Sequence, residues 1–421
     1  MGIFGTNAGS IENLTLDGSI MLHIDESEEY SLGLTAVNRG NISACINNAS
    51  ISSSIENIKA YNNGSSRYIY VGGIAGQIYA ENQNFKITGC INNGSIKCTN
   101  NSAEYGYAVG GICAFIVTNS GVEINSCTNT ANIVVASEAY AIVGGIAGAI
   151  MNIENVQDST IIKNCANISN NSTINITKCV NGAGGGIAGI FLNSQVVNCY
   201  NTQDIIIPLE SKICYSGGIV GGTEDLETIE HAEKIENCVN TGKNITGKSP
   251  NSIIPEFSNV ITNLCYASNN SGADISGILN SSLFDENSGK LETPVTVNGS
   301  EISNVAEALN AYVAAHPDEG YKTWSSYDSF GKAEPLISSI VIRQIKPADE
   351  NGNTSATAVV TNVSCSGLTV NKLTWEYNGL SAVYDDTALS GDTVFSFGII
   401  IPEFVEADST SSPVGLNVTA E

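Results

Sequence analysis

The chain has 421 residues, of which 14% are charged, and its 17 Lys plus Arg against 42 Asp plus Glu give a net charge of −25. A surface this acidic repels phosphate backbones and anionic lipid headgroups, so we expect no nucleic-acid partner. The longest uncharged apolar candidate, residues 139–151, is broken by glycine and is too short for a membrane-spanning helix, so we also expect no membrane span.

Two acidic runs lie at residues 25–29 and 224–230. They are the candidates for loosely bound calcium, although most runs of this kind are solvated loops. The N-terminus lacks a basic stretch followed by an apolar one, and no sorting signal follows residue 414. We therefore expect that the export signal and the anchor are not present in this chain.

A glycine-rich segment recurs through the first half of the chain. The letters VGGIAG stand at residues 71–76 and 143–148, and near copies stand at 109–114, 184–189 and 216–221. The copies repeat at a step of roughly 36 to 38 residues, which is typical of solenoids, propellers and other arrays.

A second repeat lies between the glycine-rich segments and reads Ile or Val, two residues, Cys, one residue, Asn. Six copies are in phase, and a further copy at Cys179 is interpreted as an insertion. The in-phase cysteines are Cys45, Cys90, Cys127, Cys165, Cys199 and Cys238. The asparagines that follow them are Asn47, Asn92, Asn129, Asn167, Asn201 and Asn240.

Within each period, short segments rich in Ile and Val alternate with Asn, Gly and Ser, a pattern that predicts strands and turns. Several short strands per repeat predict an all-β chain with a right-handed parallel β-helix over residues 1–290. A propeller ranks lower, because its blades need longer antiparallel strands and aromatic signatures, whereas aromatic residues are 7% of the chain.

The stacking of coils predicts what each repeated residue does. Cys and Asn two residues apart face the same side of a strand, so the cysteines form an interior column of free thiols. The asparagines form a ladder of side-chain hydrogen bonds from coil to coil, because their amides are costly to bury unpaired. The glycines permit a sharp corner or a close approach between coils.

Residues 2–20, GIFGTNAGSIENLTLDGSI, resemble the GLUG repeat, and VGGIAG followed by ITGCINNGSI resembles its Cys-containing variants. The resemblance covers approximately residues 2–280. Such repeats occur in large surface proteins of gut and other anaerobic bacteria. The resemblance therefore implies a secreted or surface-displayed solenoid of an anaerobic bacterium, and it implies no substrate.

After residue 290 the composition changes, which marks a domain boundary. Residues 291–336 form a closing segment with an amphipathic helix that Ser303 caps and Pro317 stops, and we expect this capping helix to lie over the last coil. Residues 337–421 alternate like short strands and predict a small immunoglobulin-like β-sandwich with Trp375 in its core.

Catalytic chemistry is not indicated. The GxGxxG match at Gly184, Gly186 and Gly189 is one copy of the repeated corner and lacks a following helix, so we expect no cofactor. The three histidines, His23, His231 and His316, are not clustered and include no HExxH motif. We expect no catalytic residues and leave the metal question open.

These observations favour a non-catalytic extracellular scaffold or adhesin that binds glycans or proteins on a surface. One alternative is a polysaccharide lyase or hydrolase, because β-helices also host such enzymes and line their grooves with carboxylates. A second alternative is a structural subunit that stacks end to end on further copies of itself.

Overall fold

The computed structural model describes most of the chain, with gaps. The described residues are 2–24, 30–55, 67–80, 83–103, 105–152, 160–208, 213–223, 233–255, 260–268, 282–285, 290–297, 300–331, 340–345, 353–360, 373–377, 380–384, 395–402 and 417–420. The chain divides into two compact units, of which the larger comprises Met1–Glu12 and Leu16–Lys332 and the smaller comprises Asn13–Thr15 and Ala333–Glu421.

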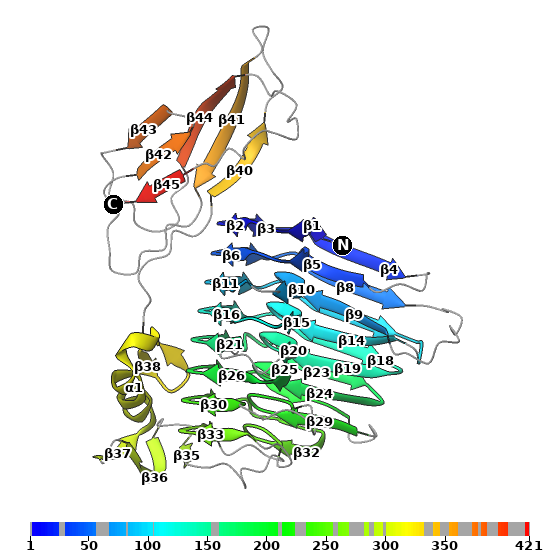
Figure 1. Ribbon diagram of the computed structural model, residues 1–421, viewed down its shortest axis with the longest axis vertical. Helices are drawn as coiled ribbons and strands as arrows, with labels where there is room; N and C mark the ends of the chain where they lie inside the picture. The colour runs from blue at the N-terminus through cyan, green and yellow to red at the C-terminus, as the bar shows by residue number, and fades with distance from the viewer. Residues whose placement is uncertain are drawn as a thin grey trace. The chain divides into compact units, whose positions relative to one another are not determined.

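The larger unit is a stack of coils, and each complete coil passes through five strand positions (Figure 1). The first two positions, here called row a and row b, meet at the Gly-Gly corner and belong to one sheet. Row a contains β9 (Arg67–Gly72), β14 (Tyr105–Gly110), β19 (Tyr140–Gly144), β24 (Asn181–Gly185), β29 (Ile213–Gly217) and β32 (Lys248–Asn251). Row b contains β1 (Gly2–Asn7), β10 (Ala75–Ala80), β15 (Cys113–Thr118), β20 (Ala147–Asn152) and β25 (Ala188–Leu192). The long strand β5 (Tyr30–Asn38) pairs with both rows.

Three further sheets complete the coil. Sheet II contains β2 (Ser10–Glu12), β6 (Asn41–Ser43), β11 (Phe85–Thr88), β16 (Val122–Asn125), β21 (Thr160–Lys163), β26 (Ser194–Val197), β30 (Lys234–Glu236) and β33 (Ile261–Asn263). Sheet III contains β3 (Thr15–Leu16), β7 (Ile46–Asn47), β12 (Ile91–Asn92), β17 (Thr128–Asn129), β22 (Ala166–Asn167), β27 (Tyr200–Asn201), β31 (Val239–Asn240), β34 (Tyr266–Ser268) and β35 (Ser282–Asp285), extended by antiparallel β36 (Lys290–Val297) and β37 (Ser300–Asn304). Sheet IV contains β4 (Ser19–Ile24), β8 (Ser50–Ile55), β13 (Ile96–Asn100), β18 (Ile133–Ser137), β23 (Thr173–Lys178) and β28 (Asp204–Ile206).

Successive coils pair in parallel and in register, so equivalent residues stack directly. Ile87 lies opposite Ile42 and Ile124, and Asn92 lies opposite Asn47 and Asn129. Long parallel sheets built from a repeated sequence are the arrangement of a β-solenoid, as the repeats predict.

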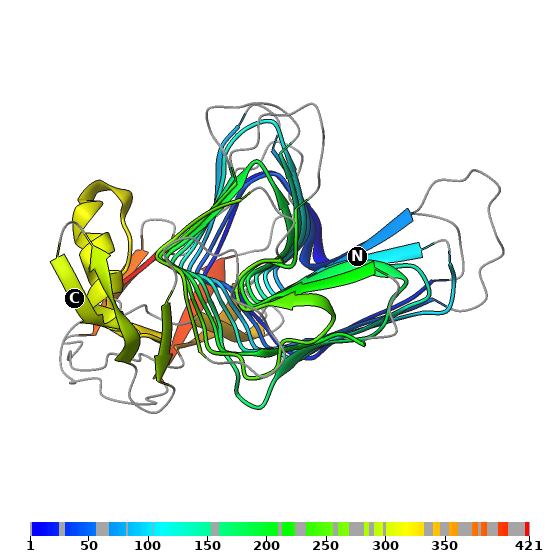
Figure 2. The same ribbon diagram turned by 90° about the horizontal axis from the view of Figure 1, so that it is seen from below.

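Viewed along the stack, the coil is pinched into two lobes (Figure 2). One lobe lies between row a and sheet IV and buries residues such as Ile69, Val71 and Ile133. In the other, row b and sheet II contribute Ile78 and Ile87, which are 1% and 0% exposed. Strand residues alternate between core and surface, which explains the Ile- and Val-rich spacing of the repeat.

The closing segment carries α1 (Val305–Ala315), a 3₁₀ turn (Pro317–Glu319) and the hairpin of β38 (Trp324–Ser326) and β39 (Ser329–Phe330). The predicted cap is wrong by one residue, because the side chain of Asn304 accepts a hydrogen bond from the Glu307 amide and no cap by Ser303 is needed.

The expected position of the helix also needs correction. Its buried residues pack on the outer side of sheet III, so α1 lies along the flank of several coils rather than across the last one. The outward side chains of this part of sheet III are apolar, and the helix removes them from water. The packed residues on the solenoid side are Ala166, Val197, Tyr200, Val239, Leu264 and Tyr266.

The described residues of the smaller unit form two antiparallel sheets of three strands each. One sheet contains β40 (Ile340–Ile345), β41 (Asn353–Val360) and β44 (Phe395–Pro402). The other contains β42 (Leu373–Tyr377), β43 (Leu380–Tyr384) and β45 (Asn417–Ala420). Trp375 lies on β42, but its side-chain surroundings fall outside the described part of the chain, as do the acidic runs at residues 25–29 and 224–230.

Candidate ligand-binding groove

The six repeat asparagines form one continuous row of hydrogen bonds inside sheet III. Each side-chain amide donates to the side-chain oxygen of the next coil, from Asn47 through Asn92, Asn129, Asn167 and Asn201 to Asn240. The five links measure 2.7, 2.9, 2.8, 2.7 and 2.8 Å. All six side chains are 0% exposed, so the row gives partners to buried amides. Only the last amide, that of Asn240, has no partner in the row, because Ala267 stands opposite it on the next coil.

The six repeat cysteines stack two residues away and are buried free thiols. Each thiol lies near a backbone oxygen of the preceding coil, for example Cys127 Sγ at 3.5 Å from Ile87 O and Cys165 Sγ at 3.6 Å from Ile124 O. Cys265 adds a seventh position that the sequence pattern missed, because Thr262 stands where the pattern requires Ile or Val and Ala267 stands where it requires Asn.

The Gly-Gly corner pinches the coil against this asparagine row. A Cβ at Gly145 would lie 2.4 Å from Asn167 Cγ and 2.1 Å from Gly186 O. The glycines at 73, 111, 186 and 218 meet the asparagine row in the same way. Only a residue without a side chain fits there, which is why the Gly-Gly letters recur.

The coil that contains β32 and β34 lacks both the corner glycine and the asparagine. Ser252 stands opposite Gly218, at the position that is glycine in the five preceding coils. In that coil the asparagine is also replaced, by Ala267 opposite Asn240. The larger residue at the corner accompanies the smaller residue in sheet III, so the two positions share one limited space.

A second row of asparagines holds residues 300–331 of the closing segment. We call these residues the latch. The residue before each column cysteine has a left-handed backbone, with φ of 56° at Asn164, 54° at Asn198 and 53° at Asn237, a conformation that Asn tolerates. Asn164 Nδ2 donates to Gly320 O at 3.0 Å, and Trp324 Nε1 donates to Asn198 Oδ1 at 2.6 Å.

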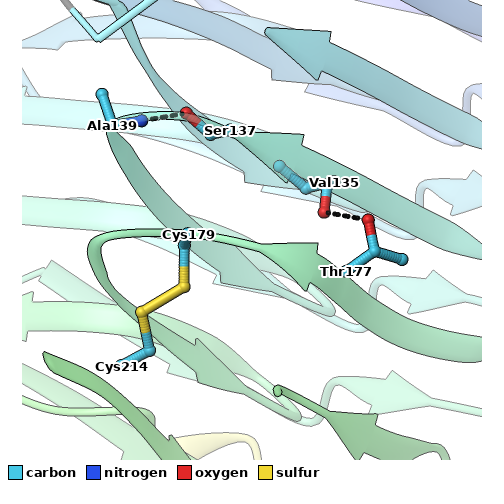
Figure 3. The surroundings of a disulfide bond; sticks show 6 residues. All are labelled: Val135, Ser137, Ala139, Thr177, Cys179 and Cys214. Carbon is cyan, nitrogen blue, oxygen red and sulfur yellow. Dashed lines mark hydrogen bonds between the residues drawn. A yellow bond between two sulfur atoms is a disulfide. The ribbon is translucent and has the colours of Figure 1, made fainter. Parts of the chain in front are cut away.

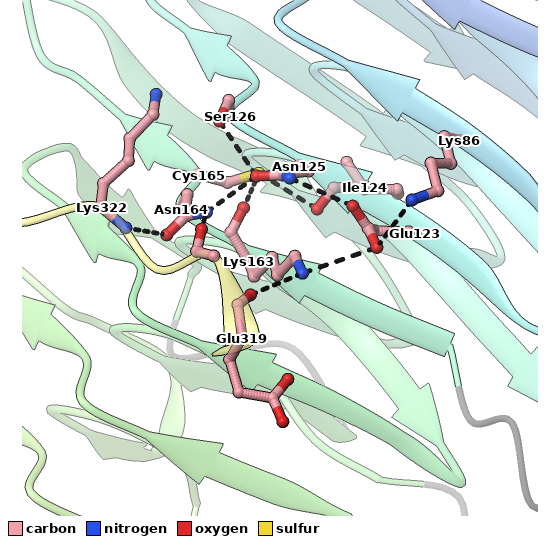
Figure 4. Close-up of polar contacts among 11 residues, drawn as sticks. Lys86, Glu123, Ile124, Asn125, Ser126, Lys163, Asn164, Cys165, Glu319 and Lys322 are labelled. Carbon is pink, nitrogen blue, oxygen red and sulfur yellow. Dashed lines mark hydrogen bonds and ion pairs between the residues drawn. The ribbon is translucent and has the colours of Figure 1, made fainter. Parts of the chain in front are cut away.

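Charged groups support the latch at its upper end (Figure 4). Lys163 Nζ donates to Glu319 O at 2.9 Å and also pairs with Glu123 at 3.5 Å. Tyr200, on β27, packs against Trp324 of the latch with ring centroids 5.8 Å apart. Burial in this contact raises the pKa of Tyr200 to about 12. The latch is therefore fixed by hydrogen bonds as well as by apolar packing.

The copy interpreted as an insertion has a separate role, because Cys179 forms a disulfide with Cys214 (Figure 3). Cys179 precedes β24 and Cys214 lies on β29, two strands that pair with each other. Both cysteines border the lobe between row a and sheet IV rather than the thiol column. The disulfide joins two consecutive coils at their edge.

A concave corner lies on the outer side of the pinch, where rows a and b meet, and it holds a pocket of about 180 Å³. Row a contributes Tyr68, Tyr70, Ala108 and Ile142. Row b contributes Phe115, Ala149, Met151 and Ile190. These are the outward-facing positions of their strands, and they form two facing columns that run along the stack. We call this feature the corner groove.

Aromatic rings form the upper wall of the corner groove. Tyr70 of row a and Phe115 of row b stack across it with ring centroids 4.9 Å apart. Tyr68 lies 6.3 Å from Tyr70 and 6.1 Å from Tyr140, measured between ring centroids. Gly106, which lies between Tyr68 and Tyr140 in register, makes this approach possible, because a Cβ there would come within 2.9 Å of both residues.

On the coil next to Tyr70 and on the coil next to Phe115, each column has a polar side chain. Ser31 stands above Tyr70, and Gln77 stands above Phe115. Ser31 Oγ donates to Gln77 Oε1 at 2.7 Å, and Gln77 Nε2 donates to Tyr79 Oη at 3.3 Å. The corner groove therefore combines an apolar floor and flat aromatic walls with a neighbouring amide and hydroxyl.

No sequence pattern singled out the corner groove. Its residues alternate with core residues in RYIYVG and AFIVT, but alternation alone does not show that the surface is concave.

Of the three histidines, His316 ends α1, where its ring nitrogen lies 2.8 Å from Tyr312 O, while His231 and the side chain of His23 lie outside the described residues.

Within the described ranges, no group of three or more His, Cys, Asp or Glu side chains is arranged to hold a metal ion. The described part of the chain also contains no helix with the length and apolar character needed to cross a membrane. No protein-family model matches the chain, and no curated protein matches it.

Proposed function

We propose that this protein is a non-catalytic extracellular scaffold or adhesin whose solenoid presents the corner groove to a glycan or protein on a surface. The observation that carries the proposal is the aromatic groove built on a stack of paired coils. Its residues sit on strands whose backbones are fixed by hydrogen bonds to both neighbouring coils, and rigid elements hold a binding surface better than loops do.

Two further features support this role. Half-buried aromatic and apolar side chains that gather in a concavity, as Tyr68, Phe115 and Ile190 do here, mark interaction sites, whereas scattered ones do not. The resemblance to GLUG repeats and the acidic composition fit display outside the cell of an anaerobic bacterium. In this proposal the coils wind right-handed, and the smaller unit is an immunoglobulin-like module. In this role the solenoid supplies reach, and the groove supplies contact.

The test is retention without turnover. The intact protein is incubated with pectins, mucin glycans and host proteins, with and without Ca²⁺, and both the bound fraction and the release of fragments are measured. We expect at least one polymer to be retained and none to be cleaved. Release of fragments from any polymer would replace this proposal with the lyase or hydrolase alternative.

A further inference from the structure

We propose that the corner groove binds a neutral glycan, with the chain of sugar rings lying along the solenoid axis and one ring seated in the pocket beside Tyr70 and Phe115. This inference rests on the proposed function and names the ligand class of the same surface. It follows from the hydrogen bonding of the strands, the chemistry of the walls and the charge of the protein.

The backbone of the groove has no capacity to bind an extended peptide. The strands of both rows donate and accept their main-chain hydrogen bonds along the stack, as β14 does with β9 and β19 and as β15 does with β10 and β20. A peptide that binds by strand addition needs a free sheet edge, and the groove is made of sheet faces. Recognition must therefore come from side chains.

The side chains fit a sugar. Each face of a pyranose ring presents C–H groups, while its rim presents hydroxyls. The floor at Ala149 and Ile190 is apolar, and the partly exposed rings of Tyr68 and Phe115 offer flat surfaces. Tyr70, which is 6% exposed, stacks against both rings and holds them in place. A tyrosine such as Tyr68 combines an apolar ring with a polar tip, which suits a ring with C–H faces and a hydroxyl rim.

The columns also fix the direction of the ligand. Aromatic side chains of the groove come from β9, β15 and β19, which belong to three consecutive coils. Coils repeat at about 4.8 Å, so the aromatic positions span about 10 Å along the stack. A linear chain of sugars can follow these positions, whereas a compact ligand would use only one of them.

Charge selects a neutral glycan over an acidic one. None of the eight residues that line the pocket is charged, and the net charge of the chain is −25. The summed field of such a protein repels polyanions such as polygalacturonate and sulfated glycans. A neutral chain meets no such repulsion.

The experiment measures the dissociation constants of cellohexaose, xylohexaose, mannohexaose and polygalacturonate by isothermal titration calorimetry with the intact protein. Ala149→Leu fills the pocket with an apolar side chain, and Tyr70→Ala removes one wall. Tyr70→Phe keeps the ring, and Met21→Ala changes an exposed apolar residue (74% exposed) on sheet IV, outside the groove. Thermal melting of every variant checks that it is folded.

We expect wild type to bind at least one neutral hexasaccharide. Ala149→Leu should weaken this binding about tenfold or more because leucine occupies the pocket. Tyr70→Ala should weaken it by a similar factor because the rings of Tyr68 and Phe115 lose the ring that holds them in place. Tyr70→Phe should change it less than about threefold, and Met21→Ala should leave it unchanged. Ala149→Leu is decisive if Tyr70→Ala does not fold.

Each contrary result separates the two proposals. If wild type binds host proteins but no neutral glycan, the glycan assignment fails and the scaffold function stands. If a bound glycan is cleaved, the scaffold function fails and the groove assignment stands. Tighter binding of polygalacturonate overturns the neutral class, and unchanged binding by Ala149→Leu overturns the groove.

Discussion

Replacing Asn129 with leucine tests the asparagine row at its middle. Asn129 donates to Asn167 Oδ1 at 2.8 Å and accepts from Asn92 Nδ2 at 2.9 Å and from the amide of Ala131 at 3.3 Å. Leucine has nearly the same shape but offers neither donor nor acceptor. The substitution therefore orphans three buried polar groups on residues 92, 131 and 167 without opening a large cavity.

The magnitude follows from these three groups. Each buried group left without a partner costs about 1–3 kcal/mol. Burial of the leucine side chain returns roughly 1.5–3 kcal/mol. The middle of these ranges gives a fall in the free energy of unfolding of about 4 kcal/mol.

Urea unfolding followed by circular dichroism measures this loss, with Asn93→Leu as the matched control. Asn93 follows Asn92, which is the neighbour of Asn129 in the asparagine row, and its amide donates to Asn48 Oδ1 at the surface at 2.9 Å. The control should change the free energy of unfolding by about 0.5 kcal/mol or less. Equal urea midpoints for Asn129→Leu and wild type, or an equal loss in both variants, would refute the asparagine row as a source of stability.

Three further predictions concern the corner, the thiols and the latch. Gly145→Ala should lower the free energy of unfolding by about 3 kcal/mol or more, because the added Cβ meets backbone and the asparagine row. In the same urea assay Gly222→Ala should be neutral, because nothing lies within 4 Å of its added Cβ. A neutral Gly145→Ala would contradict the close contact between the Gly-Gly corner and the asparagine row. Burial raises the pKa of Cys98, so above about pH 8.5 the unfolded state loses this proton while the folded state keeps it, and stability falls as pH rises. Urea melts from pH 7 to 10 should show a shallower fall for Cys98→Ala, and an unchanged slope would count against burial of this thiol. Trp324→Phe removes the hydrogen bond to Asn198 and should speed limited proteolysis within residues 300–331, and unaltered cleavage would show that this bond does not hold the latch.

The repeated parts of the fold could be predicted from the sequence because stacking imposes the same demand on every coil. A residue such as Asn92 has identical neighbours above and below, so its letter recurs at each period. The same reasoning failed where the period is broken. Cys265 was missed because Thr262 and Ala267 interrupt the motif, and the pairing of Cys179 with Cys214 could not be predicted because neither residue is in phase with the thiol column.

The corner groove could not be predicted because its residues do not repeat. Tyr70, Ala108 and Ile142 occupy one column with three different letters, since outward positions need not match between coils as core positions do. The concavity depends on the pinch, which depends in turn on contact between the corner glycines and the asparagine row. The flank position of α1 was missed for a similar reason, because the apolar outer face of sheet III comes from single residues such as Val239 and Tyr266.

The most direct test of groove binding is a ¹⁹F NMR titration of fluorotyrosine-labelled protein with cellohexaose, xylohexaose and mannohexaose. The chain has 16 tyrosines, so one spectrum reports on the groove, the latch and the smaller unit together. We predict that the signals of Tyr68 and Tyr70 shift until saturation with at least one neutral glycan, that Tyr200 and Tyr312 in the latch interface do not shift, and that the glycan is recovered intact. Unshifted Tyr68 and Tyr70 signals with all three glycans, or shifts confined to other tyrosines, would contradict binding in the corner groove.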